Sequence, residues 1–167
     1  SSAATTGDGF LKLGEIAEHE FKQPPINALG VASLQDLRGK PVLVAYWGHT
    51  TWADDWVEDV LAWQLEYGDD LAVVFCEMQG AKPDTIEATI VQKSWIHTRA
   101  LWTTEYVASS GLRGVPQYSL LSGSGELIMN GNSAVVGCNF VPRRLEELAD
   151  AIAEQVRVRR SGPKDLP

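Results

Sequence analysis

Short apolar runs alternate along the chain with stretches in which apolar residues recur at helical spacing. Residues 42–46 are a continuous apolar run, which favours a central strand covered on both faces, and residues 71–78 predict a second buried strand. Residues 51–67 between them are amphipathic, with an acidic side opposite an apolar stripe. The stripe consists of Trp52, Trp56, Val60 and Trp63. A strand, a helix and a strand of these lengths predict a right-handed parallel crossover.

Further elements are predicted on both sides of this unit. Before it, Pro24 and Pro25 predict an extended connector, and residues 33–37 predict one helical turn capped by Ser33. After it, the pattern predicts a helix at 83–94, a strand-like segment at 95–102, a short helix at 104–110, a hairpin at 117–121 and 126–129, a loop at 130–138 and a closing helix at 142–156. The first strand runs directly into the acidic start of the 51–67 helix. Free backbone N–H groups and the helix dipole converge at such a junction, which makes it the first candidate for a functional site.

Length and charge narrow the classes of protein. The 167 residues suit one domain over residues 10–156, with a small, polar, disordered leader at 1–9 and a flexible basic tail at 157–167. The formal net charge of −8 argues against a nucleic-acid partner. No apolar run approaches the roughly 20 residues of a membrane span. The leader is typical of an exported mature protein, so we expect a periplasmic or extracellular location.

Two motifs and a short step carry a resemblance to a known family. Residues 33–47 read SLQDLRGKPVLVAYW, residues 111–127 read GLRGVPQYSLLSGSGEL, and a Val136-Gly137 step precedes the last helix. This combination resembles the thioredoxin superfamily, in particular the TlpA-like and redoxin branch of exported thiol-disulfide oxidoreductases. The resemblance implies an α/β thioredoxin-like fold with a central mixed β-sheet flanked by helices on both faces. It also implies a cis peptide bond before Pro116, beside the family's active site.

The chain departs from the family pattern at the catalytic positions. Members of the family continue from the Tyr-Trp pair through two residues and a tryptophan into Cys-x-x-Cys. Laid on that pattern without a gap, this chain has Thr51 and Asp54 at the cysteine positions and Thr50 at the position of the tryptophan. Ala45 occupies the place where related thioredoxins carry a buried acid as proton acceptor. The attacking thiol, the resolving thiol and the proton relay are therefore all replaced.

The substitutes do not supply the lost chemistry. Disulfide exchange needs a thiolate, whereas the Thr51 hydroxyl stays protonated unless an adjacent base activates it. Asp54 is a poor base at the positive end of a helix, where its charged form is stabilised. The spacing instead fits a helix cap, in which Thr51 accepts the backbone N–H of residue 54 and Asp54 accepts that of residue 51. No catalytic residue is assigned, and the chain is interpreted as leaning away from an enzyme.

The preferred interpretation is a redox-inactive module that binds or scaffolds a protein or peptide partner. The predicted docking face surrounds the former cysteine positions and the proline loop, because exposed tryptophans suit interface hot spots. Its residues are Trp47, His49, Thr50, Trp52, Val115 and Pro116. Inward packing of Trp52 in the apolar stripe is the competing interpretation.

Two alternatives remain open at this stage. The first is a thiol-disulfide oxidoreductase or peroxiredoxin-like enzyme that uses Cys76 or Cys138, although both read as buried hydrophobes and a disulfide between them is a further option. The second is a metal or small-ligand site formed by His49, Asp54 and Asp55. The sequence predicts no cofactor and no metal, and it leaves the oligomeric state and the partner open.

Overall fold

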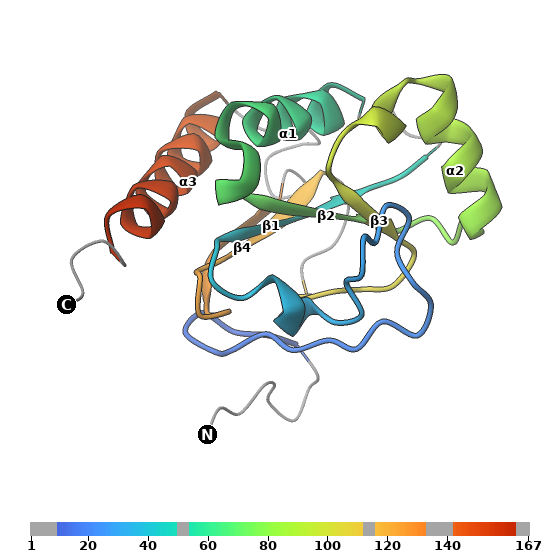
Figure 1. Cartoon of the computed structure of the whole chain (residues 1–167). Helices are drawn as coiled ribbons and strands as arrows, with labels where there is room; N and C mark the ends of the chain where they lie inside the picture. The colour runs from blue at the N-terminus through green and yellow to red at the C-terminus, as the bar shows by residue number, and fades with distance from the viewer. Residues whose placement is uncertain (1–9, 50–53, 112–115, 133–141, 163–167) are drawn as a thin grey trace.

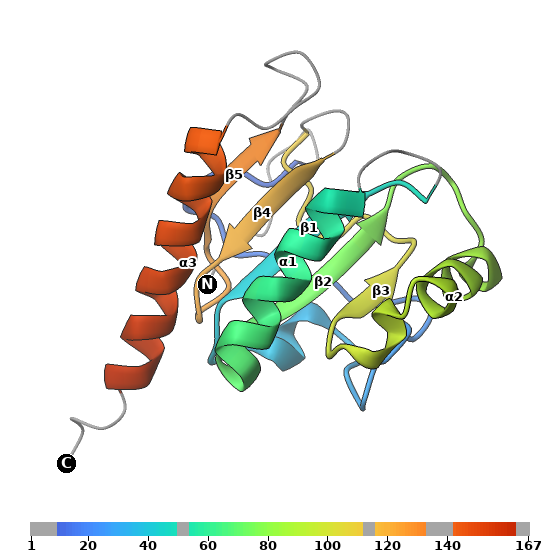
Figure 2. The same ribbon diagram turned by 90° about the horizontal axis from the view of Figure 1, so that it is seen from above.

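The computed structural model describes residues 10–49, 54–111, 116–132 and 142–162. Its strands form one five-stranded mixed sheet of order β3-β2-β1-β4-β5. Figures 1 and 2 show the strands, which are β1 (Val42–Trp47), β2 (Ala72–Glu77), β3 (Leu101–Thr103), β4 (Gln117–Leu121) and β5 (Leu127–Asn132). β1 pairs in parallel with β2, and β2 in parallel with β3. β4 is antiparallel to both β1 and β5. The predicted order of the parallel pair and the hairpin is confirmed.

The central strand β1 is buried on both sides, as its continuous apolar character requires. All six of its residues are buried. Successive side chains of a strand point to opposite faces, so Leu43, Ala45 and Trp47 enter one apolar cluster. Val42, Val44 and Tyr46 enter the other cluster. The sheet therefore has two separate hydrophobic layers.

Three α-helices cover the first of these faces (Figure 1). They are α1 (Asp54–Tyr67), α2 (Pro83–Gln92) and α3 (Pro142–Ser161). Each contributes buried side chains to the cluster that contains Trp47. Figure 2 shows α1 above β1 and β2, with α3 towards β5 and α2 towards β3. None of the helices in the described part of the chain is long and apolar enough to cross a membrane.

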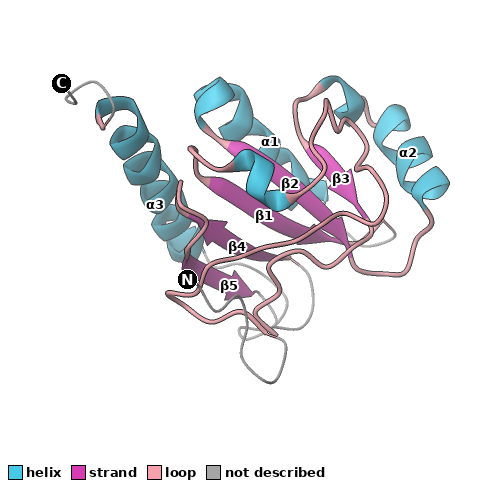
Figure 3. Ribbon diagram, turned by 60° about the horizontal axis from the view of Figure 1, so that its bottom comes forward, coloured by secondary structure: helices cyan, strands magenta, loops and turns pink. Residues whose placement is uncertain are grey.

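The second face is covered by the N-terminal segment, residues 10–37, whose described helical structure is one 3-10 turn, η1 (Leu34–Leu37). The segment runs from the β5 side of the sheet to the β3 side (Figure 3). It makes an isolated bridge between Ile16 and Glu126 near β5 and another between Ile26 and Trp102 on β3. The α/β class is as predicted, but the described α-helices flank one face only, and mostly extended chain covers the face where further helices are predicted.

Several predicted elements after α2 differ in the structure. β5 continues to Asn132, into the predicted loop 130–138, and α3 continues to Ser161, into the predicted tail 157–167. Residues 104–110, predicted as a short helix, form a loop, because their carbonyl groups accept hydrogen bonds from other segments. Val107 accepts one from the Tyr46 hydroxyl, Ala108 one from Ser119 Oγ at 3.0 Å, and Ser109 one from the backbone of Leu11 at 2.8 Å. The predicted strand-like segment 95–102 divides into a 3-10 turn, η3 (Trp95–His97), and the start of the three-residue strand β3.

Candidate functional site

The candidate site lies where β1 ends, at the edge of the sheet that also holds the end of β2 and the start of β4. Trp47 pairs with Glu77, the last residue of β2, and Tyr46 pairs with Gln117, the first residue of β4. The chain order reverses here, because β2 follows β1 on one side and β4 flanks it on the other. Open α/β sheets bind ligands at the carboxyl ends of strands at such a reversal.

Glu77 is the centre of the polar structure at this edge. Its side chain is fully buried and accepts four hydrogen bonds. Oε2 accepts the His49 backbone N–H at 3.0 Å and lies 2.7 Å from His49 Nδ1. Oε1 accepts the backbone N–H groups of Gln79 at 2.9 Å and Ala81 at 3.1 Å. One carboxylate therefore ties the segment after β1 to the loop between β2 and α2.

Electrostatics keep this carboxylate ionised. Burial by itself raises the pKa of Glu77, but the hydrogen bonds from His49, Ala81 and Gln79 outweigh burial and hold the pKa below its ordinary value of 4.5. A carboxylate accepts hydrogen bonds only, so His49 Nδ1 carries a hydrogen. In the neutral imidazole this leaves Nε2 as an acceptor. The His49 side chain is 21% exposed, so a fixed and partly accessible imidazole stands at the site.

The two loops pack closely at Gly48, where a larger residue would displace the side chain of Gln79. A Cβ atom there would lie 2.6 Å from Cδ of Gln79. The backbone adds a further link, since Met78 N–H donates to the Trp47 carbonyl at 2.9 Å. The site is thus built on a rigid frame rather than on a loose loop.

Trp47, which the sequence places on the docking face, is buried instead, with 1% of its surface exposed. Its ring packs edge-on against Trp102 at 5.4 Å and against Trp95 at 6.0 Å between centroids. Because the β1 side chains alternate, Trp47 points into the helical layer and not along the strand towards solvent. Trp47 therefore packs beneath the site in the core and has almost no exposed surface that a partner could contact.

The other predicted site residues fall into two groups. Pro116 is described and buried, and it lies next to Gln117 at the same edge as Trp47. Thr50, Thr51, Trp52, Val115 and Cys138 lie outside the described residues. The cap predicted for Thr51 and Asp54 and the cis bond predicted at Pro116 therefore stay predictions.

The alternative metal site is not assembled among the described residues. His49 pairs with Glu77, whereas Asp54 accepts a hydrogen bond from Nζ of Lys93, the residue that follows α2. No group of three histidine, cysteine, aspartate or glutamate side chains in the described ranges is placed to hold a metal ion.

Cys76 is a free thiol that does not face the candidate site. It belongs to the apolar layer under the N-terminal segment, together with Tyr46 and Val107. Burial, with a smaller contribution from Glu105, raises the pKa of the Cys76 thiol to about 12 against a lowering hydrogen bond from the Val107 backbone. A thiol in this state is a poor nucleophile at neutral pH.

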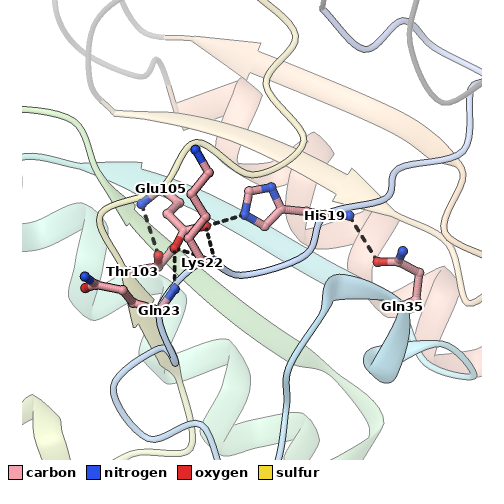
Figure 4. A network of polar contacts seen from close by, with 6 residues as sticks. All are labelled: His19, Lys22, Gln23, Gln35, Thr103 and Glu105. Carbon is pink, nitrogen blue, oxygen red and sulfur yellow. Dashed lines mark hydrogen bonds and ion pairs between the residues drawn. The ribbon is translucent and has the colours of Figure 1, made fainter.

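Figure 4 shows a second acid, the partly buried Glu105, which follows β3 and fastens the N-terminal segment. Its Oε1 lies 2.7 Å from His19 Nε2, and its two oxygens accept the backbone N–H groups of Lys22 and Gln23 at 3.0–3.1 Å. Burial raises the pKa of Glu105, but these bonds, the one from His19 foremost, bring the net pKa below its ordinary value. The structure gives His19 this structural role, which no motif in the sequence indicates.

Sequence reasoning also missed Glu77. The available signal was an acid at the carboxyl end of a buried run, paired in register with the residue that ends the neighbouring strand. The partner, His49, lies 28 residues away in sequence. Recognising the pair from sequence requires the β1–β2 register, which the apolar pattern alone leaves open by several residues.

Comparisons with known proteins identify the architecture. No protein-family model and no curated protein matches the chain. Solved structures do match. A thioredoxin-like superfamily protein is 17% identical with a TM-score of 0.61, and the match covers 87% of this chain and 97% of that one. A thiol-disulfide isomerase from Corynebacterium glutamicum is 15% identical with a TM-score of 0.59, covering 87% and 96%. A thiol:disulfide interchange protein of the thioredoxin family from Chlorobium tepidum is 12% identical with a TM-score of 0.59, covering 86% and 96%.

These likenesses define the class of this protein as an α/β protein with the thioredoxin-like fold. The edge of the sheet that holds His49, Glu77 and Pro116 is thus the edge at which this fold, by the resemblance described above, carries its active site.

Proposed function

We propose that this thioredoxin-like protein binds a protein or peptide partner through its docking face and does not exchange disulfides. The docking face is now His49, Thr50, Trp52 and Val115, because Trp47 and Pro116 are both buried. We also place the protein outside the cytoplasm, because its sequence resembles the exported branch of the family.

The observation that carries the proposal is that neither family cysteine position holds a cysteine and that Cys76, the cysteine within the described residues, does not face the candidate site. The sequence has two cysteines, and neither stands at position 51 or 54. Burial raises the pKa of the Cys76 thiol to about 12, so this group carries almost no thiolate for disulfide exchange at pH 7. Thr51 and Asp54 occupy the two family cysteine positions. Their hydroxyl and carboxylate groups cannot attack a disulfide. A thioredoxin-like scaffold that lacks the two thiols of the family motif favours a role in binding.

The Glu77–His49 pair supports binding from the other side. Holding Nδ1 fixes the orientation of the imidazole before a partner arrives. Preorganisation of one side chain saves about 0.5–1.5 kcal/mol of ordering free energy on binding. His49 Nε2 then offers a positioned acceptor for a backbone N–H of an extended peptide, in the manner of the hydrogen bonds that fix peptides at sheet edges.

The redox half of the proposal is tested by insulin reduction with dithiothreitol as electron donor. We expect no acceleration by the unmodified protein and clear acceleration by the Thr51→Cys/Asp54→Cys double variant, because the scaffold would regain both thiols. Turnover by the unmodified protein would overturn the proposal in favour of an enzyme that uses Cys138 or Cys76.

The binding half is tested with a displayed library of random peptides. Selected peptides are measured against the unmodified protein and against His49→Ala and Trp52→Ala, with His97→Ala as the matched histidine control because His97 is exposed on η3. We expect the first two variants to weaken binding at least about tenfold, which corresponds to 1.4 kcal/mol, and the control to leave it unchanged. Equal affinities across the set would rule out the docking face.

A further inference from the structure

A cavity unrelated to the docking face lies at the opposite ends of the strands. Its volume is about 430 Å³, and it is lined at the amino ends of β2 and β3 by Leu71, Ala72 and Leu101. A neighbouring cavity of about 420 Å³ runs along the last turns of α1 past Leu61 and Leu65. These volumes lie within the range of small-molecule sites.

The two cavities share three lining residues, which are Gln64 on α1, Gly68 and Arg99. Gln64 is only 5% exposed. The amide oxygen Oε1 is buried and has no hydrogen-bond partner among the described residues. A buried acceptor without a donor is costly, so such groups in native proteins call for an explanation. A ligand that brings an N–H or O–H group into the cavity would satisfy it.

Two cationic side chains line the same cavity as Gln64. Lys40 and Arg99 line the first cavity, and Asp69 is the one acidic side chain among its described lining residues. Asp69 pairs with Arg99, while Lys40 has no ion-pair partner in the described part of the chain. The cavity therefore carries a net charge of +1 from these three groups, in a protein whose formal net charge is −8. A local positive charge of this kind favours an anionic ligand.

We propose that this cavity binds a small amphipathic carboxylate with a hydrogen-bond donor next to its carboxylate end, the chemistry of an N-acylated amino acid. The carboxylate meets Lys40 and Arg99, and the amide N–H donates to Gln64 Oε1. The acyl chain lies on the apolar wall formed by Leu37, Leu71 and Leu101. This site is independent of the docking face, because its residues lie at the other ends of the strands.

Three probes separate the parts of this recognition, with binding to the full chain measured by isothermal titration calorimetry. N-octanoylglycine has the chain, the N–H and the carboxylate. Octanoate lacks the N–H, and N-octylacetamide lacks the carboxylate. We expect saturable binding of N-octanoylglycine at least about tenfold tighter than either of the other two, since each lacks one charged or polar contact. Equal affinities for the three probes, or no saturable binding of any, would overturn the proposal and leave a solvent-filled cavity.

Two variants assign the contacts to residues. Gln64→Leu keeps the approximate shape of the side chain and should remove the advantage of N-octanoylglycine over octanoate. Lys40→Gln should weaken N-octanoylglycine and leave N-octylacetamide unchanged. Lys82→Gln, an exposed lysine before α2, is the matched control and should change neither. If Gln64→Leu and Lys40→Gln both bind all probes as the unmodified protein does, the site is elsewhere. The His49→Ala variant should bind these probes normally, so failure here is distinct from failure of the proposed peptide binding.

Discussion

Replacing Glu77 by glutamine tests whether the buried carboxylate holds the candidate site together. The amide keeps the size of the side chain and one acceptor oxygen, but its NH₂ group donates. Two of the four donors that now point at the carboxylate, from His49, Gln79 and Ala81, would therefore face another donor. Each hydrogen bond to a charged acceptor is worth about 1.5–3 kcal/mol net. Relief from burying a charge returns a few kcal/mol. We expect a net loss of about 2 kcal/mol in the free energy of unfolding, or roughly 4–8 °C in Tm.

The sign of the pH dependence follows from the lowered pKa of Glu77. A carboxyl group whose folded pKa lies below its unfolded value stabilises the fold fully above the unfolded value and loses that contribution as pH falls through the folded value. The ordinary value is 4.5, and the folded pKa is lower. The difference in unfolding free energy between the unmodified protein and Glu77→Gln should thus be largest at neutral pH. It should shrink as the pH falls below about 4.5.

Urea denaturation followed by tryptophan fluorescence measures this difference at neutral pH and in acid. Glu87→Gln is the matched control, because Glu87 is an exposed acid on α2 and undergoes the same chemical change. We expect the control to lie within about 0.5 kcal/mol of the unmodified protein. A Glu77→Gln midpoint equal to that of the control at neutral pH, or a difference that grows in acid, would show that Glu77 does not act as described.

Three further predictions follow from other buried groups. In a Cys138→Ala background, Cys76 should resist alkylation by iodoacetamide in native buffer at pH 7 and react at once in urea, because burial raises the pKa of its thiol to about 12; rapid native labelling would contradict this. Glu105→Gln should speed amide hydrogen exchange in the segment at residues 19–23 without comparable change in β1, as local opening predicts; unchanged exchange would show that the carboxylate does not fasten the segment. Gly131→Ala should cost about 1–3 kcal/mol in denaturant unfolding, because its Cβ would lie 2.5 Å from Cε2 of Tyr118, and a neutral result would mean that this ring moves freely.

The sheet was predictable from sequence because its signals are local. The apolar runs at 42–46 and 71–78 each specify a buried strand without reference to any other segment, and both strands occur within one or two residues of those bounds. The hairpin was equally accessible, since the turn at 122–125 is rich in glycine and serine. The element order then left few topologies, because parallel strands need a crossover and hairpin strands do not.

The elements that failed depend on partners far away in sequence. Residues 104–110 have ordinary helical composition, yet their carbonyl groups are taken by Tyr46, Ser119 and Leu11. The prediction of helices on the second face of the sheet was wrong for the same reason. Residues 10–32 have no periodicity, and they are ordered through the bridges at Ile16 and Ile26. A local pattern cannot show hydrogen bonds that another segment supplies.

The candidate site divides along the same line. The place of the site was predictable, because a buried strand entering a helix is a local signal, and the loss of the thiols is written in the sequence at Thr51 and Asp54. Its polar frame was not predictable, since Glu77 reads as the polar end of a strand until β1 and β2 are placed in register. That register turns His49 from one polar residue near two acids of α1 into a fixed imidazole on a buried carboxylate. A junction stabilised only by apolar packing would need no buried charge there, because an apolar residue of similar size avoids the cost of desolvation. The retention of an ionised, fully bonded Glu77 therefore favours a junction whose geometry is held for binding, even though the thiols that the fold usually presents there are absent.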